Sequence, residues 1–142
     1  CDIRIAAEGS LLGFPETNLG IFPGGGGTQR LPRIVGLGWA THLILTGKPI
    51  DADTALKIGL ITALVPVDKL MEEALKLASI LAAKAPITTR VTKQCLYKGV
   101  TTDLASGLSY EQKAFSYLFA TQDQKEGMRA FLEKRKPVFQ GK

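Results

Sequence analysis

The sequence predicts an α/β protein in two parts: a mixed α/β part over residues 1–66 and an all-helical part over residues 67–142. In the first part, short apolar runs are bounded by glycine and proline, which is typical of strands and tight turns. In the second part, apolar residues recur three and four positions apart, which is typical of amphipathic helices. A length of 142 residues and a hydrophobic content of 45% are ordinary for a globular domain.

The elements of the first part follow from its turn and cap residues. Thr28 is a suitable N-cap for a helix that Gly36 would end, and Asp51 is a suitable N-cap for another that Gly59 would end. The glycines of residues 20–27 exclude a regular element there. In order, we expect strands over Ile3–Ala7 and Leu11–Phe14, a tight loop over 20–27, helices over 29–35, 38–45 and 52–58, and a strand over 60–65.

The second part should contain four helices. Apolar residues from Leu70 to Leu81 share one helical stripe, which Pro86 ends. A second helix should run from Thr88 to Tyr97. Asp103 and Asp123 are the expected N-caps of the third and fourth helices.

The few strands of the first part suggest that the chain is a fragment. An isolated pair of short strands is only marginally stable in water, so these strands need partners from elsewhere. The sequence also begins at Cys1, without a methionine, in what reads as the middle of a strand. We therefore expect a missing N-terminal half of the same protein to be a partner of this chain.

Composition narrows the classes of function. Two cysteines, Cys1 and Cys95, are too few for a disulfide scaffold and fit a reducing compartment. His42 is the single histidine, so no zinc site is expected. No apolar run reaches the length of a membrane span, so no membrane partner is expected. The net charge of +5 favours anionic partners, although Lys134-Arg135-Lys136 is only a short basic run and, from charge patterning alone, a solvated helix end is equally plausible.

The glycine-rich loop and the glutamate before it are the candidate site. Gly24–Gly27 follow neither the P-loop nor the dinucleotide-binding pattern, but glycines before a helix start let a ligand approach the backbone closely. Glu16 lies just upstream among apolar residues, a setting suited to a general acid. The alternatives are a flexible surface turn for the loop and an ordinary surface glutamate for Glu16.

Several motifs in this order resemble the enoyl-CoA hydratase/isomerase family, also called the crotonase superfamily, over the whole chain. The most specific are the Pro-Gly-Gly-Gly-Gly-Thr-Gln-Arg string and the Lys-Arg tail. The Leu-Pro-Arg that follows also resembles the methylglutaconyl-CoA hydratase branch, some of whose members bind RNA. The matching segments are Phe14-Pro15-Glu16, Leu19-Gly20, Pro23 to Leu31, Leu45-Thr46-Gly47, Ala55 to Leu60 with Val65-Pro66, and Glu126 to Pro137.

The resemblance implies a fold, a substrate and residue roles. The fold would be the C-terminal part of the crotonase ββα-spiral core, followed by a helical region that forms trimers or hexamers. The substrate would be a 2-enoyl-CoA thioester, without any further cofactor, in the cytoplasm or, in a eukaryote, the mitochondrial matrix. Glu16 resembles the acid that protonates C2, Gly24 the glycine that positions the water, Phe115 the aromatic near adenine in a neighbouring subunit, and Lys134 the lysine that meets the CoA phosphates.

In one respect the chain departs from the family pattern, and this bears on its activity. The other catalytic glutamate and the oxyanion-hole residues would precede the segment that matches Cys1-Asp2, so the chain alone is expected to be inactive. An enoyl-CoA isomerase or another crotonase chemistry remains an alternative. A non-catalytic oligomerisation or RNA-binding module is another, although nucleic acid is an improbable partner for so short a basic run, because such affinity needs many phosphate contacts.

Overall fold

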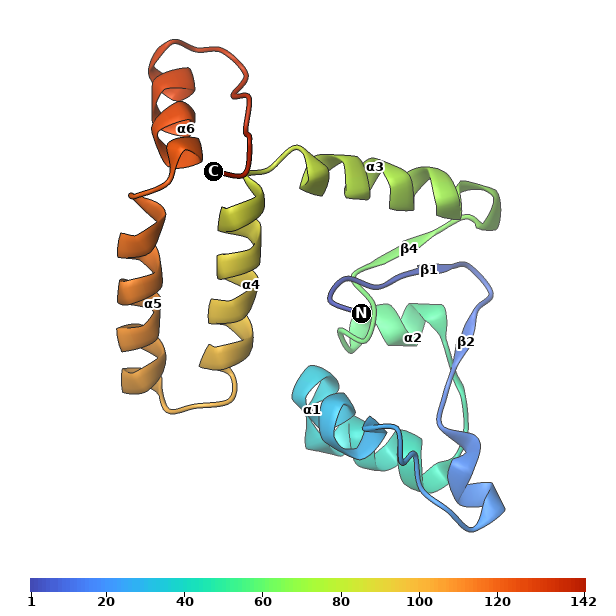
Figure 1. The fold of residues 1–142 in the computed structure, drawn as a ribbon. Coiled ribbons are helices and arrows are strands. Elements are labelled where there is room, and N and C mark those ends of the chain that lie inside the picture. Colours follow the sequence, from blue (N-terminus) through green and yellow to red (C-terminus); the bar gives the residue numbers. More distant parts are fainter. The chain divides into compact units, whose positions relative to one another are not determined.

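The computed structural model describes residues 1–142, which form two compact units, Cys1–Leu75 and Lys76–Lys142. The first unit is mixed α/β and the second is helical (Figure 1). The last strand ends at Val65, so the change to purely helical structure falls where the sequence predicts it. The division between the compact units comes later, inside the helix that begins at Leu70. None of the helices is both long and apolar enough to cross a lipid bilayer.

Four short strands in the first unit form two separate pairs. Strand β1 (Ile5–Ala7) runs parallel to β4 (Ala63–Val65), with Ala6 opposite Leu64. Strand β2 (Leu11–Leu12) runs antiparallel to β3 (Ile50–Asp51). The Arg4 carbonyl accepts hydrogen bonds from both the backbone N–H and the hydroxyl of Thr62, which extends the parallel pair. Strands β1, β2 and β4 are shorter than predicted, and β3 was not predicted. Each pair leaves both outer edges without a further strand.

The helices of the first unit enclose its core. Helix α1 (Gly27–Thr46) joins the two helices predicted over 29–35 and 38–45, and its backbone leaves helical geometry only at Gly36 (φ 77°, ψ 161°). Helix α2 (Ala52–Lys57) is capped by Asp51, whose side chain accepts from the Thr54 N–H at 2.7 Å, as predicted. The buried cluster consists of Leu31, Val35, Ala40, Leu43, Ile44, Ala52, Ala55, Leu60 and Ile61.

The second unit is a series of helices. A short 3₁₀ turn, η2 (Val67–Lys69), leads into α3 (Leu70–Ala82), the helix that contains the boundary between the units. Helices α4 (Pro86–Gly99) and α5 (Leu104–Leu118) form a hairpin, and α6 (Gln122–Leu132) follows. Pro86 occupies the first turn of α4, where a missing N–H is tolerated, and Asp103 caps α5 as predicted.

Two predicted caps are wrong. Thr28 lies inside α1, because Gly26 takes a left-handed conformation (φ 94°) and serves as N-cap two residues earlier. Thr121, not Asp123, caps α6, its hydroxyl accepting from the Gln124 N–H at 3.2 Å. Asp123 instead accepts hydrogen bonds from the backbone N–H groups of Gln140 and Gly141 at 2.7 and 2.8 Å, and so fastens the C-terminal tail.

Candidate functional site

Glu16 lies in a 3₁₀ turn, η1 (Pro15–Leu19), between β2 and the glycine-rich loop. Pro15 occupies the first position of the turn, where its fixed φ favours helical geometry. The turn closes where the Glu16 carbonyl accepts from the N–H groups of Gly20 and Ile21, and Gly20 takes a left-handed conformation (φ 75°). The chain therefore passes directly from the glutamate into the loop.

The Glu16 carboxylate has an unusual environment. Its Oε2 atom is buried, and it is the one buried side-chain oxygen or nitrogen without a hydrogen-bond partner. A buried polar atom without a partner is destabilising, so such atoms are rare in folded proteins and call for a functional or solvent explanation. Glu16 therefore stays the candidate site residue, with one buried carboxylate oxygen open to a ligand or a water molecule.

The turn that carries Glu16 is fixed to the end of α1. The Thr17 hydroxyl donates to the Ile44 carbonyl at 2.9 Å, which satisfies one of the carbonyls left free at a helix C-terminus. The Asn18 side chain lies against Gly47, where an added Cβ would approach its Nδ2 to 2.8 Å. These contacts link residues 17–18 to residues 44–47, and sequence reasoning missed them because neither Thr17 nor Asn18 belongs to a local pattern.

The four glycines of the loop differ in what requires them. An added Cβ at Gly27 would meet Pro23 at 2.8 Å and Phe14 at 3.1 Å, so packing there requires glycine. At Gly24 an added Cβ would meet only the Phe22 carbonyl at 3.9 Å. Gly24 is exposed, so its backbone is open to approach, and its role beside a ligand stays a prediction. The contact of Phe14, Pro23 and Gly27 closes the loop beside the Glu16 turn.

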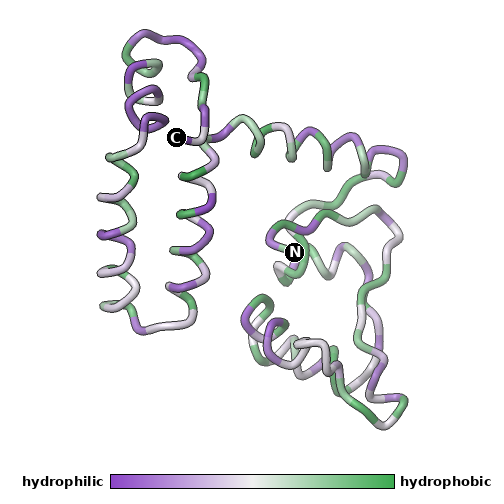
Figure 2. Tube along the Cα trace, in the orientation of Figure 1, coloured by the Kyte–Doolittle hydropathy of each residue, from purple (hydrophilic) through white to green (hydrophobic).

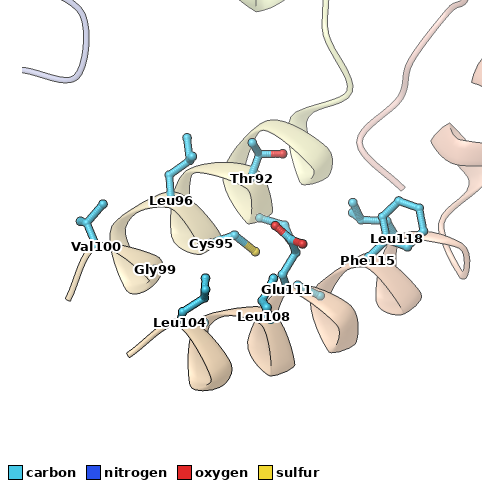
Figure 3. Close-up of a pocket in the computed structure, with 13 residues that line it drawn as sticks. Thr92, Cys95, Leu96, Gly99, Val100, Leu104, Leu108, Glu111, Phe115 and Leu118 are labelled. Carbon is cyan, nitrogen blue, oxygen red and sulfur yellow. The ribbon is translucent and has the colours of Figure 1, made fainter. Parts of the chain in front are cut away.

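Phe115 is on α5, in the second unit. Its side chain is 62% exposed and makes an edge-to-face contact with Phe119, with ring centroids 5.2 Å apart. It lines an open, mainly apolar groove of about 490 Å³ between α4 and α5. In Figure 3, Cys95 of α4 and Glu111 of α5 point into the space between the two helices. The groove is therefore suited either to packing against another apolar surface or to binding an apolar ligand.

Lys134 follows α6 directly and is the one residue other than glycine with a positive φ (54°). Its N–H donates to the Phe131 carbonyl at 3.2 Å, and the Arg135 N–H donates to the Ala130 carbonyl at 3.0 Å. This pair of bonds is the Schellman motif, in which the left-handed position is usually glycine. The Lys134 side chain is exposed, and its ammonium group makes no hydrogen bond or ion pair within the chain.

The next residue, Arg135, belongs to an ion-pair network that sequence reasoning missed. It donates to both Glu126 oxygens, at 2.6 and 2.9 Å, and to Glu133 at 2.6 Å. The hydrogen bonds from Arg135 lower the pKa of Glu126 to about 2, and the same carboxylates raise the pKa of Arg135 above its usual range. A glutamate nine residues before an arginine gives no helical signal, because the pair forms only across the turn at Lys134.

The structure brings two of the four predicted site residues into one local assembly. Glu16 and Gly24 lie in the same turn-and-loop segment of the first unit. Phe115 and Lys134 belong to separate elements of the second unit, and no hydrogen bond or ring contact joins them.

The fold, with a 3₁₀ turn whose glutamate has one buried carboxylate oxygen beside a glycine-rich helix start, is that of a crotonase-type protein. The model of the family described as Enoyl-CoA hydratase/isomerase matches residues 1–142, and the chain belongs to that family. A solved enoyl-CoA hydratase structure from Bacillus anthracis is 46% identical, with a TM-score of 0.98 over 100% of this chain and 55% of that one. The predicted fold is therefore confirmed.

Among the relatives, the crotonyl-CoA hydratase of Syntrophomonas wolfei is 49% identical over 139 residues, which are 98% of this chain and 54% of that protein. The short-chain-enoyl-CoA hydratase of Clostridioides difficile is 48% identical over 131 residues, which are 92% of this chain and 84% of that protein. The chain spans about half the length of most of the relatives compared here, the S. wolfei enzyme among them.

Proposed function

We propose that the protein hydrates a 2-enoyl-CoA thioester, adding water across the 2,3 double bond. The observation that carries the proposal is the buried, unpartnered Oε2 of Glu16 beside the open backbone of the glycine-rich loop. A carboxyl group held there has a free oxygen to exchange a proton with a substrate carbon. Relatives at 46–49% identity that are named crotonyl-CoA and short-chain-enoyl-CoA hydratases support the same chemistry.

In the proposed reaction, water adds at C3 and a proton is added at C2. Glu16 donates that proton during hydration and removes it during dehydration, which is general acid–base catalysis by one group. Gly24 offers exposed backbone that would help position the water. The negative charge that develops on the thioester oxygen needs donors placed in advance. The chemistry uses no metal or prosthetic group, since CoA is part of the substrate.

We propose that the remaining catalytic residues lie in a further segment. The second glutamate and the oxyanion donors that the family pattern requires have no counterpart among the 142 residues. Most of the relatives are about twice as long, and the strand pairs of the first unit have open edges that a further segment would cover. We therefore expect residues 1–142 alone to be inactive and the segment that matches the other half of the relatives to restore activity.

The second unit would bind the CoA part of the substrate and join subunits. The free ammonium group of Lys134 is suited to a CoA phosphate, and the exposed ring of Phe115 to the adenine bound by a neighbouring subunit. Assembly as a trimer, or as a pair of trimers, would cover apolar side chains that this unit leaves exposed. The two free cysteines fit a reducing compartment, and we propose the cytoplasm.

The decisive variant is Glu16→Gln in the protein with both halves present. It should lower the hydration rate of crotonyl-CoA by about 10²–10⁴-fold, the usual contribution of a general acid. Binding of CoA, measured by calorimetry, should stay unchanged. Glu8→Gln is the matched control, because Glu8 is exposed on the same unit and loses the same charge. Hydration within twofold of the wild type in Glu16→Gln would remove Glu16 from the mechanism.

The same assay decides between the hydratase and its alternatives. An isomerase would convert a 3-enoyl-CoA into the 2-enoyl-CoA faster than it hydrates crotonyl-CoA. A non-catalytic module would do neither, with or without the second segment. If RNA is the ligand, the salt dependence of its binding should report several ion contacts, whereas a slope of one or two would leave no support for it.

A further inference from the structure

The three basic residues that follow α6, Lys134, Arg135 and Lys136, are not equivalent. Arg135 makes three hydrogen bonds to two carboxylates, whereas the ammonium groups of Lys134 and Lys136 make none within the chain. The charge of the middle residue is therefore neutralised locally. The charge available to an anionic ligand at this place comes from the lysines on either side.

Arg135 also joins the two sides of the turn. Its guanidinium grips Glu126 on α6 with two bonds and Glu133 at the helix end with one. The same Glu126 carboxylate accepts from the Val138 N–H at 2.9 Å, beyond the turn. Residues 126, 133, 135 and 138 are thus joined in one hydrogen-bond network that includes residues on both sides of Lys134 in the sequence.

The conformation of Lys134 needs such support. A left-handed backbone is unfavourable for a lysine, because its Cβ approaches the following carbonyl oxygen. The two Schellman hydrogen bonds hold the turn from the main chain, and the Arg135 network holds it from the side chains. The result is a reversal of the chain with the exposed Lys134 at its apex.

We propose that Arg135 is a positioning residue for CoA binding, which holds Lys134 in its left-handed turn and keeps the Glu126 and Glu133 carboxylates away from the Lys134 ammonium. This inference rests on the proposed function, since it takes a CoA phosphate as the ligand of Lys134. Without Arg135, Glu133, the neighbour of Lys134 in sequence, would lose its partner, and Glu126 would keep only the Val138 N–H. Both carboxylates could then compete with the phosphate for the charge of Lys134.

The test is a double-mutant cycle read out by binding. The complete protein is titrated calorimetrically with CoA and with pantetheine, which lacks the nucleotide and its phosphates. We expect Lys134→Ala and Arg135→Gln each to weaken CoA binding about tenfold, the size of one lost charge-assisted hydrogen bond. Pantetheine binding should change by less than about twofold, and the double variant should bind CoA no more weakly than either single variant.

A conservative variant separates positioning from loss of charge. Arg135→Lys keeps the charge but not the two-pronged grip on Glu126, so it should also weaken CoA binding, by less than Arg135→Gln does. It serves as the second test if Arg135→Gln fails to fold. Glu133→Gln, which leaves the Glu126 grip in place, should weaken CoA binding less than Glu126→Gln.

Four results would overturn the inference. Additive effects in the double variant would mean that Arg135 contacts the ligand itself. Equal weakening of CoA and pantetheine would mean general structural damage. Unchanged CoA binding in Arg135→Gln, with a tenfold loss in Lys134→Ala, would sink the positioning role while leaving the proposed function intact. A wild-type protein that binds neither CoA nor crotonyl-CoA would sink both.

Discussion

The two units of the chain keep their apolar side chains in different places. The first unit buries a cluster of nine apolar residues, with Leu43 fully buried at its centre. In the second unit only Ala85 and Ala130 are buried apolar residues, and large side chains along α4, α5 and α6 are exposed. Hydrophobic stretches recur along these helices in Figure 2. Both units expose large apolar side chains, but only the first also buries a cluster of them, so it is the unit with its own core.

Each unit has a helix that ends in a Schellman motif, but the left-handed residue of the motif differs between the units. At the end of α2, Gly59 is left-handed (φ 75°), with the Gly59 N–H bonded to the Leu56 carbonyl and the Leu60 N–H to the Ala55 carbonyl. At the end of α6, the same pair of bonds surrounds Lys134. The first unit uses the residue that favours this backbone, and the second unit uses one that disfavours it. The CoA-binding role proposed for Lys134 would require a side chain at this position.

The largest expected effect is on the free energy of unfolding, and it tests whether a buried core is confined to the first unit. Leu43→Ala should lower the free energy of unfolding by about 2–5 kcal/mol, the usual result for a fully buried leucine. Leu108→Ala, on α5 with 54% of its side chain exposed, should lower it by less than about 1 kcal/mol in the monomer. Urea unfolding measures both. Equal losses at low protein concentration would contradict the difference between the units.

A smaller effect is expected at the irregular point of α1. Gly36 has φ 77° and ψ 161°, a region open essentially only to glycine, so Gly36→Ala should destabilise the protein by about 1–3 kcal/mol. Gly38→Ala is the control in the same helix, since an added Cβ there meets nothing within 4 Å. It should stabilise by roughly 0.5–1 kcal/mol. Thermal unfolding of both variants tests the pair, and a harmless Gly36→Ala would contradict it.

Substitutions of the left-handed residues that follow α2 and α6 are expected to change stability in opposite directions. Gly59→Ala should destabilise the protein by about 1 kcal/mol, and Lys134→Gly should stabilise it by about the same amount, because each exchange reverses the cost of a left-handed side-chain-bearing residue. Lys134→Gly should weaken CoA binding at the same time. A Lys134→Gly variant that is no more stable than the wild type would mean that the turn carries no strain.

The smallest expected effect is on stability at acidic pH. The pKa of Glu126 is lowered to about 2 in the folded state, so its contribution to stability is complete above its ordinary value of about 4.5 and is lost as the pH falls from there towards 2. Glu126→Gln should remove this part of the acid destabilisation. The thermal midpoint measured between pH 2 and 6 reports it, with Glu8→Gln as control. Parallel curves for Glu126→Gln and the wild type would contradict the assignment.

Local signals predicted the order of the helices, and the errors have local causes. Asp51 and Asp103 were correctly identified as caps because each accepts from the N–H three residues later. Asp123 was not, because Thr121 supplies the cap and backbone N–H groups 17 and 18 residues away take up its carboxylate. Hydrogen bonds to residues so far along the chain give no recognisable pattern in a sequence window as long as one helix.

The candidate site divides in the same way. The segment from Phe14 to Gly27 is continuous, so its motif predicted that Glu16 and the loop lie together. The Arg135 network could not be predicted, because it depends on a left-handed lysine, which backbone preferences argue against. Similarly, Thr17 meets Ile44 only after α1 has formed, and the spacing of 27 residues follows from the length of that helix.

The parallel pair of β1 and β4 has a consequence for synthesis on the ribosome. Arg4 and Thr62, which extend the pair, are 58 residues apart, and everything between them must emerge first. At about 5–20 residues per second, roughly 3–12 s pass between the synthesis of β1 and that of its partner strand, and the apolar side chains of β1 are exposed to solvent and to chaperones during that time. The α4–α5 hairpin needs no such wait, because its helices are neighbours in the chain. Slower translation of residues 5–63 should therefore increase aggregation of the nascent chain more than slower translation of residues 86–118.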